Sequence, residues 1–229
     1  MKLLLSTVLG IVLLVSQANA EEKKALQTTK EKQGYSIGVS MGNGLKANAP
    51  DADFDAVVQG LKDAVSGGKL LLTEQEMKEV LAGLQKELME KQAERTKQIA
   101  EKNKKEGEEF LAANKTKEGV KTLPSGLQYK VIKDGTGKIP TENDSVVCNY
   151  RGTLVGGTEF DSSYKRGQPA TFPVKGVIPG WTEALKLMKE GSKWELFIPS
   201  SLAYGERGAG NTIGPNATLI FEIELISVK

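Results

Sequence analysis

The sequence predicts an α+β fold, in which an all-helical N-terminal half precedes a half built on one antiparallel sheet. Two observations predict this order. Residues about 21–115 have helical patterning and few strand signals, and proline is absent between Pro50 and Pro124, which suits long uninterrupted helix. The remaining residues are rich in glycine, proline and β-branched side chains. We therefore predict three segments: a leader at 1–20, a helical domain with a long linker helix at 21–121, and a sheet domain at 122–229.

The first twenty residues, MKLLLSTVLGIVLLVSQANA, have the pattern of a secretory signal peptide. Lys2 precedes an apolar run at 3–15, and the small residues of ANA at 18–20 mark a cleavage site. A transmembrane anchor is the alternative, but the run is shorter than the roughly 20 residues that a spanning helix needs. We expect cleavage after position 20, no integral membrane segment afterwards, and a location in the periplasm, at the outer membrane, on the surface or outside the cell.

Residues 34–45, GYSIGVSMGNGL, admit two interpretations. Apolar side chains at every second position suggest a strand. A helix would instead align Gly34, Gly38 and Gly42 on one face, at a cost of about 1 kcal/mol per glycine. Such a helix would need a partner packed against its small-residue face to offset this cost. One small helical half also cannot easily bury all of this apolar surface alone. We therefore interpret this segment as a homodimerisation element rather than a local hairpin.

Two further helices are marked by their caps. The segment DFDAVVQGLKDAV has apolar residues at helical spacing, with Asp53 as a candidate N-cap and the glycines at 67–68 as its end. Thr73, followed by Glu76, forms a candidate capping box. A stretch rich in Ala, Lys, Glu and Gln continues from it to about Asn114, so about forty residues would form a rod of roughly 60 Å.

This long helix changes character along its length. Its first part carries an apolar stripe that ends at Met89. Past this point Ile99 is nearly the only apolar residue of the stripe until Phe110 and Leu111. A helix that is polar all round bridges solvent between domains, so we expect Glu90–Glu109 to act as a solvent-exposed spacer.

Strands and turns alternate in the second half. Four segments are typical of strands, LPSGLQYKVIKDGTG, DSVVCNYRGTL, SKWELFIP and TLIFEIELISV, and TEFDSSY is typical of a strand edge that runs into a loop. One short helix, WTEALKLM, lies among them and is expected to cover the apolar face of a single sheet. Its first residue, Trp181, directly follows Pro-Gly. A loop tip is a poor place for a large indole, so Trp181 either caps the core from outside or forms the floor of a pocket.

The composition excludes several classes of function. The chain has no histidine and one cysteine, Cys148, which removes histidine-dependent nucleophilic triads, intrachain disulfides and histidine-ligated metals. Its 31 basic and 29 acidic residues give a net charge of +2, too small for a nucleic-acid-binding surface. We expect no cofactor, no metal and no nucleic-acid partner. Cys148 lies in a strand-like segment, so we expect a buried apolar filler rather than a reactive thiol.

Four stretches of the second half carry a resemblance to a known family: VVCNYRGTLVGGTEFDSSYKRG, VIPGW, LAYG and TLIFEIEL. Their order and spacing resemble the FKBP family of peptidyl-prolyl cis–trans isomerases. The leader, the helical half and the LPSGLQYKVI junction extend the resemblance, along nearly the full mature chain, to the Mip-type (macrophage infectivity potentiator) bacterial subfamily. It implies a sheet that forms a half-barrel wrapped on the short helix, and a V-shaped homodimer with intertwined N-terminal helices.

The resemblance implies an enzyme that accelerates X-Pro isomerisation in proline-containing unfolded proteins and peptides, with folding-chaperone activity on exported or surface proteins. The composition agrees. Rotation about the amide has a barrier of about 18–20 kcal/mol, but no proton has to move and no bond has to break, so histidine is not needed. The alternative is a non-catalytic dimeric clamp or adhesin that recognises proline without turning it over.

The resemblance also implies the site residues. The catalytic residues would be Asp161, Tyr204, Trp181, Phe160, Tyr150 and Phe221, and the substrate-binding residues would be Val177, Ile178, Arg166, Ala203 and Ile213. Trp181 would lie under the proline ring. The Ile178 N–H and the Tyr204 hydroxyl would bind substrate carbonyls, and Arg166 would orient the carboxylate of Asp161. The residues alone leave other roles open: a turn-former for the carboxylate, and plain core packing for the aromatic side chains.

Three positions depart from the family pattern. Ala170 occupies a position that is often aromatic in the family, and Ala209 and Thr212 lie where larger rim residues are common. We therefore expect a cavity that is more open on that side, with the macrolides FK506 and rapamycin as ligands. Trp194 matches no site position of the family, so we expect it to serve packing.

Overall fold

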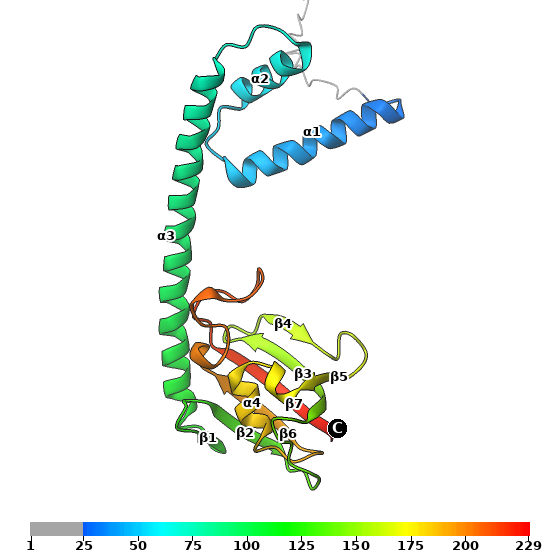
Figure 1. Ribbon diagram of the computed structural model, residues 1–229, viewed down its shortest axis with the longest axis vertical. Coiled ribbons are helices and arrows are strands. Elements are labelled where there is room, and N and C mark those ends of the chain that lie inside the picture. The colour runs from blue at the N-terminus through cyan, green and yellow to red at the C-terminus, as the bar shows by residue number, and fades with distance from the viewer. Residues whose placement is uncertain (1–24) are drawn as a thin grey trace, which may run out of the picture. The chain divides into compact units, whose positions relative to one another are not determined.

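The computed structural model of the chain describes residues 25–229 (Figure 1). The predicted signal peptide lies outside the described residues. The chain passes from one compact unit to a second one between Glu74 and Gln75. Within the described range, no helix combines the length and the apolar character that a bilayer span requires.

The first unit contains two helices, α1 (Thr29–Asn48) and α2 (Phe54–Ser66). A capping box begins α1: the Thr28 side chain accepts from the Glu31 N–H, and the Glu31 carboxylate accepts from the Thr28 N–H. The segment that admitted two interpretations is therefore helical, and the hairpin alternative is wrong. In α2 the two predicted ends are confirmed, because Asp53 accepts from the Ala56 N–H at 3.0 Å and Gly67 is left-handed, with φ of 67°.

The third helix, α3 (Glu74–Asn114), spans 41 residues and confirms the long helix. It is not a spacer as far as Glu109, however. Gly107 and Asn114 are buried, and the ring of Phe110 lies 5.8 Å from that of Phe197 in the sheet domain. The expectation was wrong for these last turns because they dock through a glycine and an asparagine. Such residues leave no hydrophobic periodicity in the sequence.

Seven antiparallel strands form the sheet (Figure 1). They are β1 (Val120–Thr122), β2 (Gln128–Lys133), β3 (Ser145–Leu154), β4 (Glu159–Ser162), β5 (Ala170–Pro173), β6 (Lys193–Ile198) and β7 (Leu219–Val228). The order is β1-β2-β6-β7-β3-β4, and β5 pairs with β3 as well. The structure confirms a single antiparallel sheet. Two strands were not predicted, β1 and β5, because three or four residues are too few to show alternation.

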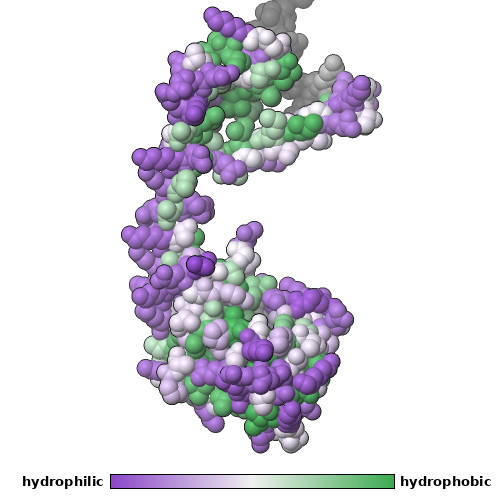
Figure 2. Space-filling view, viewed as in Figure 1, coloured by the Kyte–Doolittle hydropathy of each residue, from purple (hydrophilic) through white to green (hydrophobic). Residues whose placement is uncertain are grey.

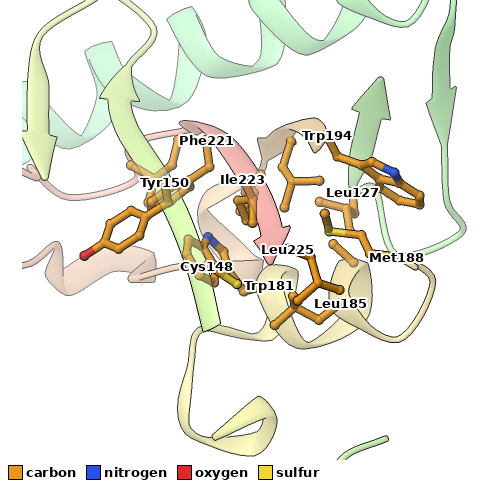
Figure 3. Close-up of a cluster of buried hydrophobic side chains, with 14 of the residues drawn as sticks. Leu127, Cys148, Tyr150, Trp181, Leu185, Met188, Trp194, Phe221, Ile223 and Leu225 are labelled. Carbon is orange, nitrogen blue, oxygen red and sulfur yellow. The ribbon is translucent and has the colours of Figure 1, made fainter. Parts of the chain in front are cut away.

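A short helix, α4 (Pro179–Leu185), covers one face of this sheet, as predicted. It begins two residues before Trp181, with proline at its first position, where the missing N–H costs no hydrogen bond. The fully buried Leu185 lies in the same cluster as Leu225 of β7 (Figure 3). Short 3₁₀ turns occupy the connections at Val174–Gly176, Ser200–Leu202 and Gly205–Arg207.

Two side chains that were expected to serve packing do so. Trp194 is 7% exposed and stacks on Tyr129, with ring centroids 4.4 Å apart. Cys148 is fully buried in β3, and burial raises the pKa of its thiol to about 12. The thiol is therefore protonated at any physiological pH, which confirms an apolar filler.

The core position of α4 gives a first prediction. Truncating Leu185 to alanine is expected to lower the free energy of unfolding by about 2–5 kcal/mol, because it leaves a cavity between the helix and the sheet. Leu187 lies two residues further on and is 44% exposed, so Leu187→Ala should cost less than about 0.5 kcal/mol. Urea unfolding of both variants checks this, and equal losses would contradict the packing described.

Candidate active site

A cavity of about 680 Å³ opens between α4, the sheet and the segment that joins β6 to β7. All predicted site residues line it except Arg166 and Ala203. The cavity also has lining residues that were not predicted to bind substrate: Phe172, Gly176, Ala209, Gly210, Asn211 and Thr212. The structure therefore brings together, in one place, residues that are spread from β3 to β7 in the sequence.

Trp181 is the floor of this cavity and is 4% exposed. Three aromatic rings meet the indole nearly edge-on, with centroids at 5.1 Å for Phe221, 5.3 Å for Tyr150 and 5.5 Å for Phe172. This perpendicular arrangement is favoured because the positive ring edges face the negative ring face. Figure 3 shows Trp181 among the core side chains, with Tyr150 and Phe221 beside it. The question of the indole after Pro-Gly is thus answered in favour of a pocket floor.

Glycine is required directly before this tryptophan. A Cβ atom at Gly180 would lie 2.5 Å from Cγ2 of Ile198 in β6, which is far too close. Ile198 is fully buried and cannot move aside without disturbing the core. The glycine therefore lets the first turn of α4 press against the sheet, and this contact sets the depth of the indole.

Asp161 lies at the edge of the cavity in a network with two other side chains. The Tyr150 hydroxyl donates to Oδ2 of Asp161 at 2.6 Å, and the Ser162 N–H donates to Oδ1 at 2.8 Å. Arg166 donates from one Nη to Oδ1 of Asp161 and from the other to the Tyr150 hydroxyl oxygen. Arg166 thus orients the carboxylate from outside the cavity, where it lines a smaller hollow of about 220 Å³.

This network sets the protonation of the site. Partial burial favours a higher pKa for Asp161, but the hydrogen bonds from Tyr150 and Arg166 and the positive charge of Arg166 together outweigh it and lower that pKa. Burial, followed by the bond to Asp161, raises the pKa of the Tyr150 hydroxyl. At neutral pH the carboxylate is therefore ionised and the phenol is protonated, so the donor and acceptor roles between them are fixed.

Several polar groups at the cavity have no protein partner among the described residues: the indole N–H of Trp181 is one, and two others are placed to bind a ligand. The Ile178 N–H lies at the N-cap of α4, where its carbonyl already accepts from Trp181 and Thr182. The hydroxyl of Tyr204, a residue that is 40% exposed, has no hydrogen bond within the described residues either. Both residues line the cavity, so both groups can bind a ligand without breaking an internal bond.

Some placements differ from the sequence-based set. Ala203 does not line the cavity but packs against the core behind it. Ala170 pairs with Cys148, and Phe172 pairs with Val146, so the two β5 residues face the same side. Phe172 is the aromatic wall that the sequence interpretation missed. Its only sequence signal was its position two residues after Ala170, in a strand too short to recognise.

An antiparallel sheet wrapped on one short helix, with an aromatic cavity between them, is the architecture of an FKBP-type domain. Comparison with family models agrees. Residues 137–226 match the model of the FKBP-type peptidyl-prolyl cis-trans isomerase, and residues 30–131 match that of the domain amino terminal to it.

Relatives match along the whole chain. The chain is 50% identical to "Outer membrane protein MIP" of Legionella longbeachae, with 100% of this chain and 98% of the relative covered. It is 48% identical to "Peptidyl-prolyl cis-trans isomerase Mip" of Coxiella burnetii, with 100% and 99% covered. The crystal structure of FkpA from Escherichia coli superposes with a TM-score of 0.71 at 39% identity, covering 90% of this chain and 99% of that one. The chain belongs to the FKBP-type peptidyl-prolyl cis–trans isomerases, in their Mip-like subfamily, which confirms the predicted enzyme over the non-catalytic alternative.

The protonation of Asp161 gives a pH prediction. Because its pKa is lowered in the folded state, its ionised form stabilises the fold at pH values above its ordinary pKa of 3.8, and this contribution is lost as the pH falls through the folded value. Asp161→Asn keeps the shape but cannot ionise. The difference in free energy of unfolding between wild type and this variant should therefore be constant from pH 7 to about pH 5 and shrink below it. A difference that does not change with pH would contradict the network.

Proposed function

We propose that the cavity binds the proline ring of an X-Pro segment over Trp181 and accelerates rotation of the preceding amide. The observation that carries this is the indole floor ringed by Tyr150, Phe172 and Phe221, an apolar space suited to a five-membered ring. The planar amide is the more polar form, and conjugation is lost in the twisted one. An apolar cavity that binds the twisted form better than the planar form lowers the barrier without proton transfer.

Three polar groups complete the mechanism. The free N–H of Ile178 and the hydroxyl of Tyr204 bind carbonyls on either side of the proline and hold the main chain while the amide turns. Among the lining residues that the structure describes, Asp161 is the only charged one. Its carboxylate faces the bond at which charge redistributes during rotation, and Arg166 and Tyr150 hold it in place.

We further propose that its substrates are proline-containing unfolded proteins and peptides outside the cytoplasm. The leader-like N-terminus supports export, and one relative is named an outer membrane protein. Uncatalysed isomerisation takes tens of seconds, so it delays the folding of exported chains. An enzyme that accelerates this step would act as a folding chaperone in the periplasm or at the surface. FK506 and rapamycin would occupy the same cavity, whose lining includes the small side chains of Ala209 and Thr212.

The helical half, residues 21–121, is proposed to hold two chains together as a homodimer, with residues 122–229 as the isomerase domain. Neither α1 nor α2 contains a buried residue. Their large apolar side chains are exposed instead: Tyr35, Ile37 and Phe54 are each more than half exposed. Figure 2 shows these helices with much hydrophobic surface, in green. Nothing lies within 4 Å of a Cβ atom built at Gly38. Open apolar surface of this extent marks an interaction site, and a second copy of the chain is the partner that covers it.

The carboxylate role is tested first. Asp161→Leu is expected to lower kcat/KM on a short X-Pro peptide by more than about tenfold, with an unchanged far-UV circular dichroism spectrum. Asp161→Asn, which keeps the hydrogen-bonding shape but loses the charge, should fall between this variant and wild type. A near-wild-type rate for Asp161→Leu would return Asp161 to the role of a turn residue and remove it from the site.

The dimer is tested by light scattering of the mature chain at micromolar concentration. Gly38→Leu places a large side chain on the small-residue face and is expected to weaken or abolish the dimer. Ser40→Leu adds the same side chain about 200° around the helix and should leave the dimer intact. Both variants should keep peptide turnover, because the cavity residues all lie in the sheet domain. A monomeric wild type would refute the proposal.

A further inference from the structure

The last turns of α3 contact the segment that carries one wall of the cavity (Figure 1). The Asn103 side-chain amide donates to the carbonyl of Pro215 at 2.8 Å. A Cβ atom built at Gly214 would lie 2.9 Å from Nδ2 of Asn103 and 3.1 Å from Cγ2 of Ile99, so the segment lies directly against the helix there. These contacts link residues more than a hundred positions apart in the chain.

One turn further along, the approach is closer still. Gly107 is buried in α3, and a Cβ atom at this position would lie 2.3 Å from Oγ1 and 3.1 Å from Cβ of Thr218. Glycine in a helix interior costs about 1 kcal/mol relative to alanine, and here only glycine allows the contact. Ile99, Asn103 and Gly107 follow one another at intervals of four residues, which places them on one face of the helix.

The segment held in this way forms the lip of the cavity, residues 208–218. Its tip is closed by two backbone hydrogen bonds, from the Ala209 N–H to the Ile213 carbonyl at 2.8 Å and from the Ile213 N–H to the Ala209 carbonyl at 3.1 Å. These two residues and those between them line the cavity. The internal bonds fix the shape of the lip, and the contacts with α3 fix where that shape stands relative to the indole floor.

We propose that Asn103 and Gly107 are positioning residues for the isomerase reaction, through which α3 holds the lip at the distance that an X-Pro segment requires. The proposal rests on the proposed function of the cavity. A lip that is already in place costs a substrate no ordering on binding, whereas a loosened lip has to be ordered each time. Loss of the contacts should therefore raise KM more than it lowers kcat.

The first experiment compares two identical substitutions on the same helix, in the full mature chain. Gly107→Ala introduces the clash with Thr218, whereas Gly83→Ala adds a methyl group where nothing lies within 4 Å. We expect Gly107→Ala to raise KM for an X-Pro peptide at least threefold with kcat retained, and Gly83→Ala to leave both unchanged. Adding Thr218→Ala to Gly107→Ala removes the closest atom of the clash and should restore KM.

The second experiment adds no atoms and does not depend on how Gly107→Ala folds. Asn103→Ala removes the bond to Pro215, and Gln98→Ala removes an amide that donates to Glu94 on the exposed face. We expect the Ala209 and Ile213 amides to exchange hydrogen at least tenfold faster in Asn103→Ala than in wild type. Gln98→Ala should exchange like wild type at both positions.

Wild-type KM and unchanged lip exchange in Asn103→Ala would overturn the proposal. So would a loss in Gly107→Ala that appears in kcat alone, or one that Thr218→Ala does not restore, because either result indicates a general loss of stability. Failure of the proposed function has a different signature: Asp161→Leu would keep its turnover while the exchange difference at the lip persists. In that case the lip is still held by α3, but it does not serve this reaction.

Discussion

The contact between Gly180 and Ile198 is the constraint on which the isomerase domain depends. It lets α4 begin so close to β6 that the indole of the next residue stands beneath three aromatic edges instead of at the surface. The same approach packs the apolar face of α4 against the sheet, where Leu185 and, three residues past the helix, Met188 are fully buried. The stability of the fold and the depth of the cavity therefore have one common cause, so a change at this contact would affect both.

The charged part of the site is arranged so that a single charge reaches the cavity. Arg166 forms an ion pair with the ionised carboxylate of Asp161 from a separate hollow, and the Tyr150 hydroxyl hydrogen-bonds to both groups. Placing both members of the ion pair inside would have added a desolvated cation beside the substrate, at a cost of several kcal/mol. The cavity thereby remains mostly apolar while its one carboxylate stays ionised and oriented, which suits a reaction in which no proton is transferred.

Sequence reasoning succeeded where local chemistry decides structure. Asp53 and Gly67 marked the ends of α2 because caps act within one turn, and the long motifs around Trp181 identified most of the residues that line one cavity. It failed where contacts form between distant segments. Phe172 lies in a strand too short to show alternation of apolar and polar residues. Gly107 is an unfavourable residue for a helix interior, and the sequence does not reveal its contact with Thr218. The glycine-rich segment of α1 admitted a strand as well as a helix, because its apolar side chains alternate while its glycines recur every four residues.

The burial of Cys148 determines how its thiol reacts in the folded chain. Cys148 is fully buried, and its backbone pairs with Ala170 of β5 and Leu225 of β7. Burial raises the pKa of its thiol to about 12. Since the thiolate is the form that reacts with oxidants and alkylating reagents, the Cys148 thiol of the folded chain reacts slowly with both. The unfolded chain regains an ordinary thiol. The rate of chemical labelling at this single thiol therefore reports how often β3 separates from its neighbouring strands. Cys148 can thus be used as a natural probe of sheet opening.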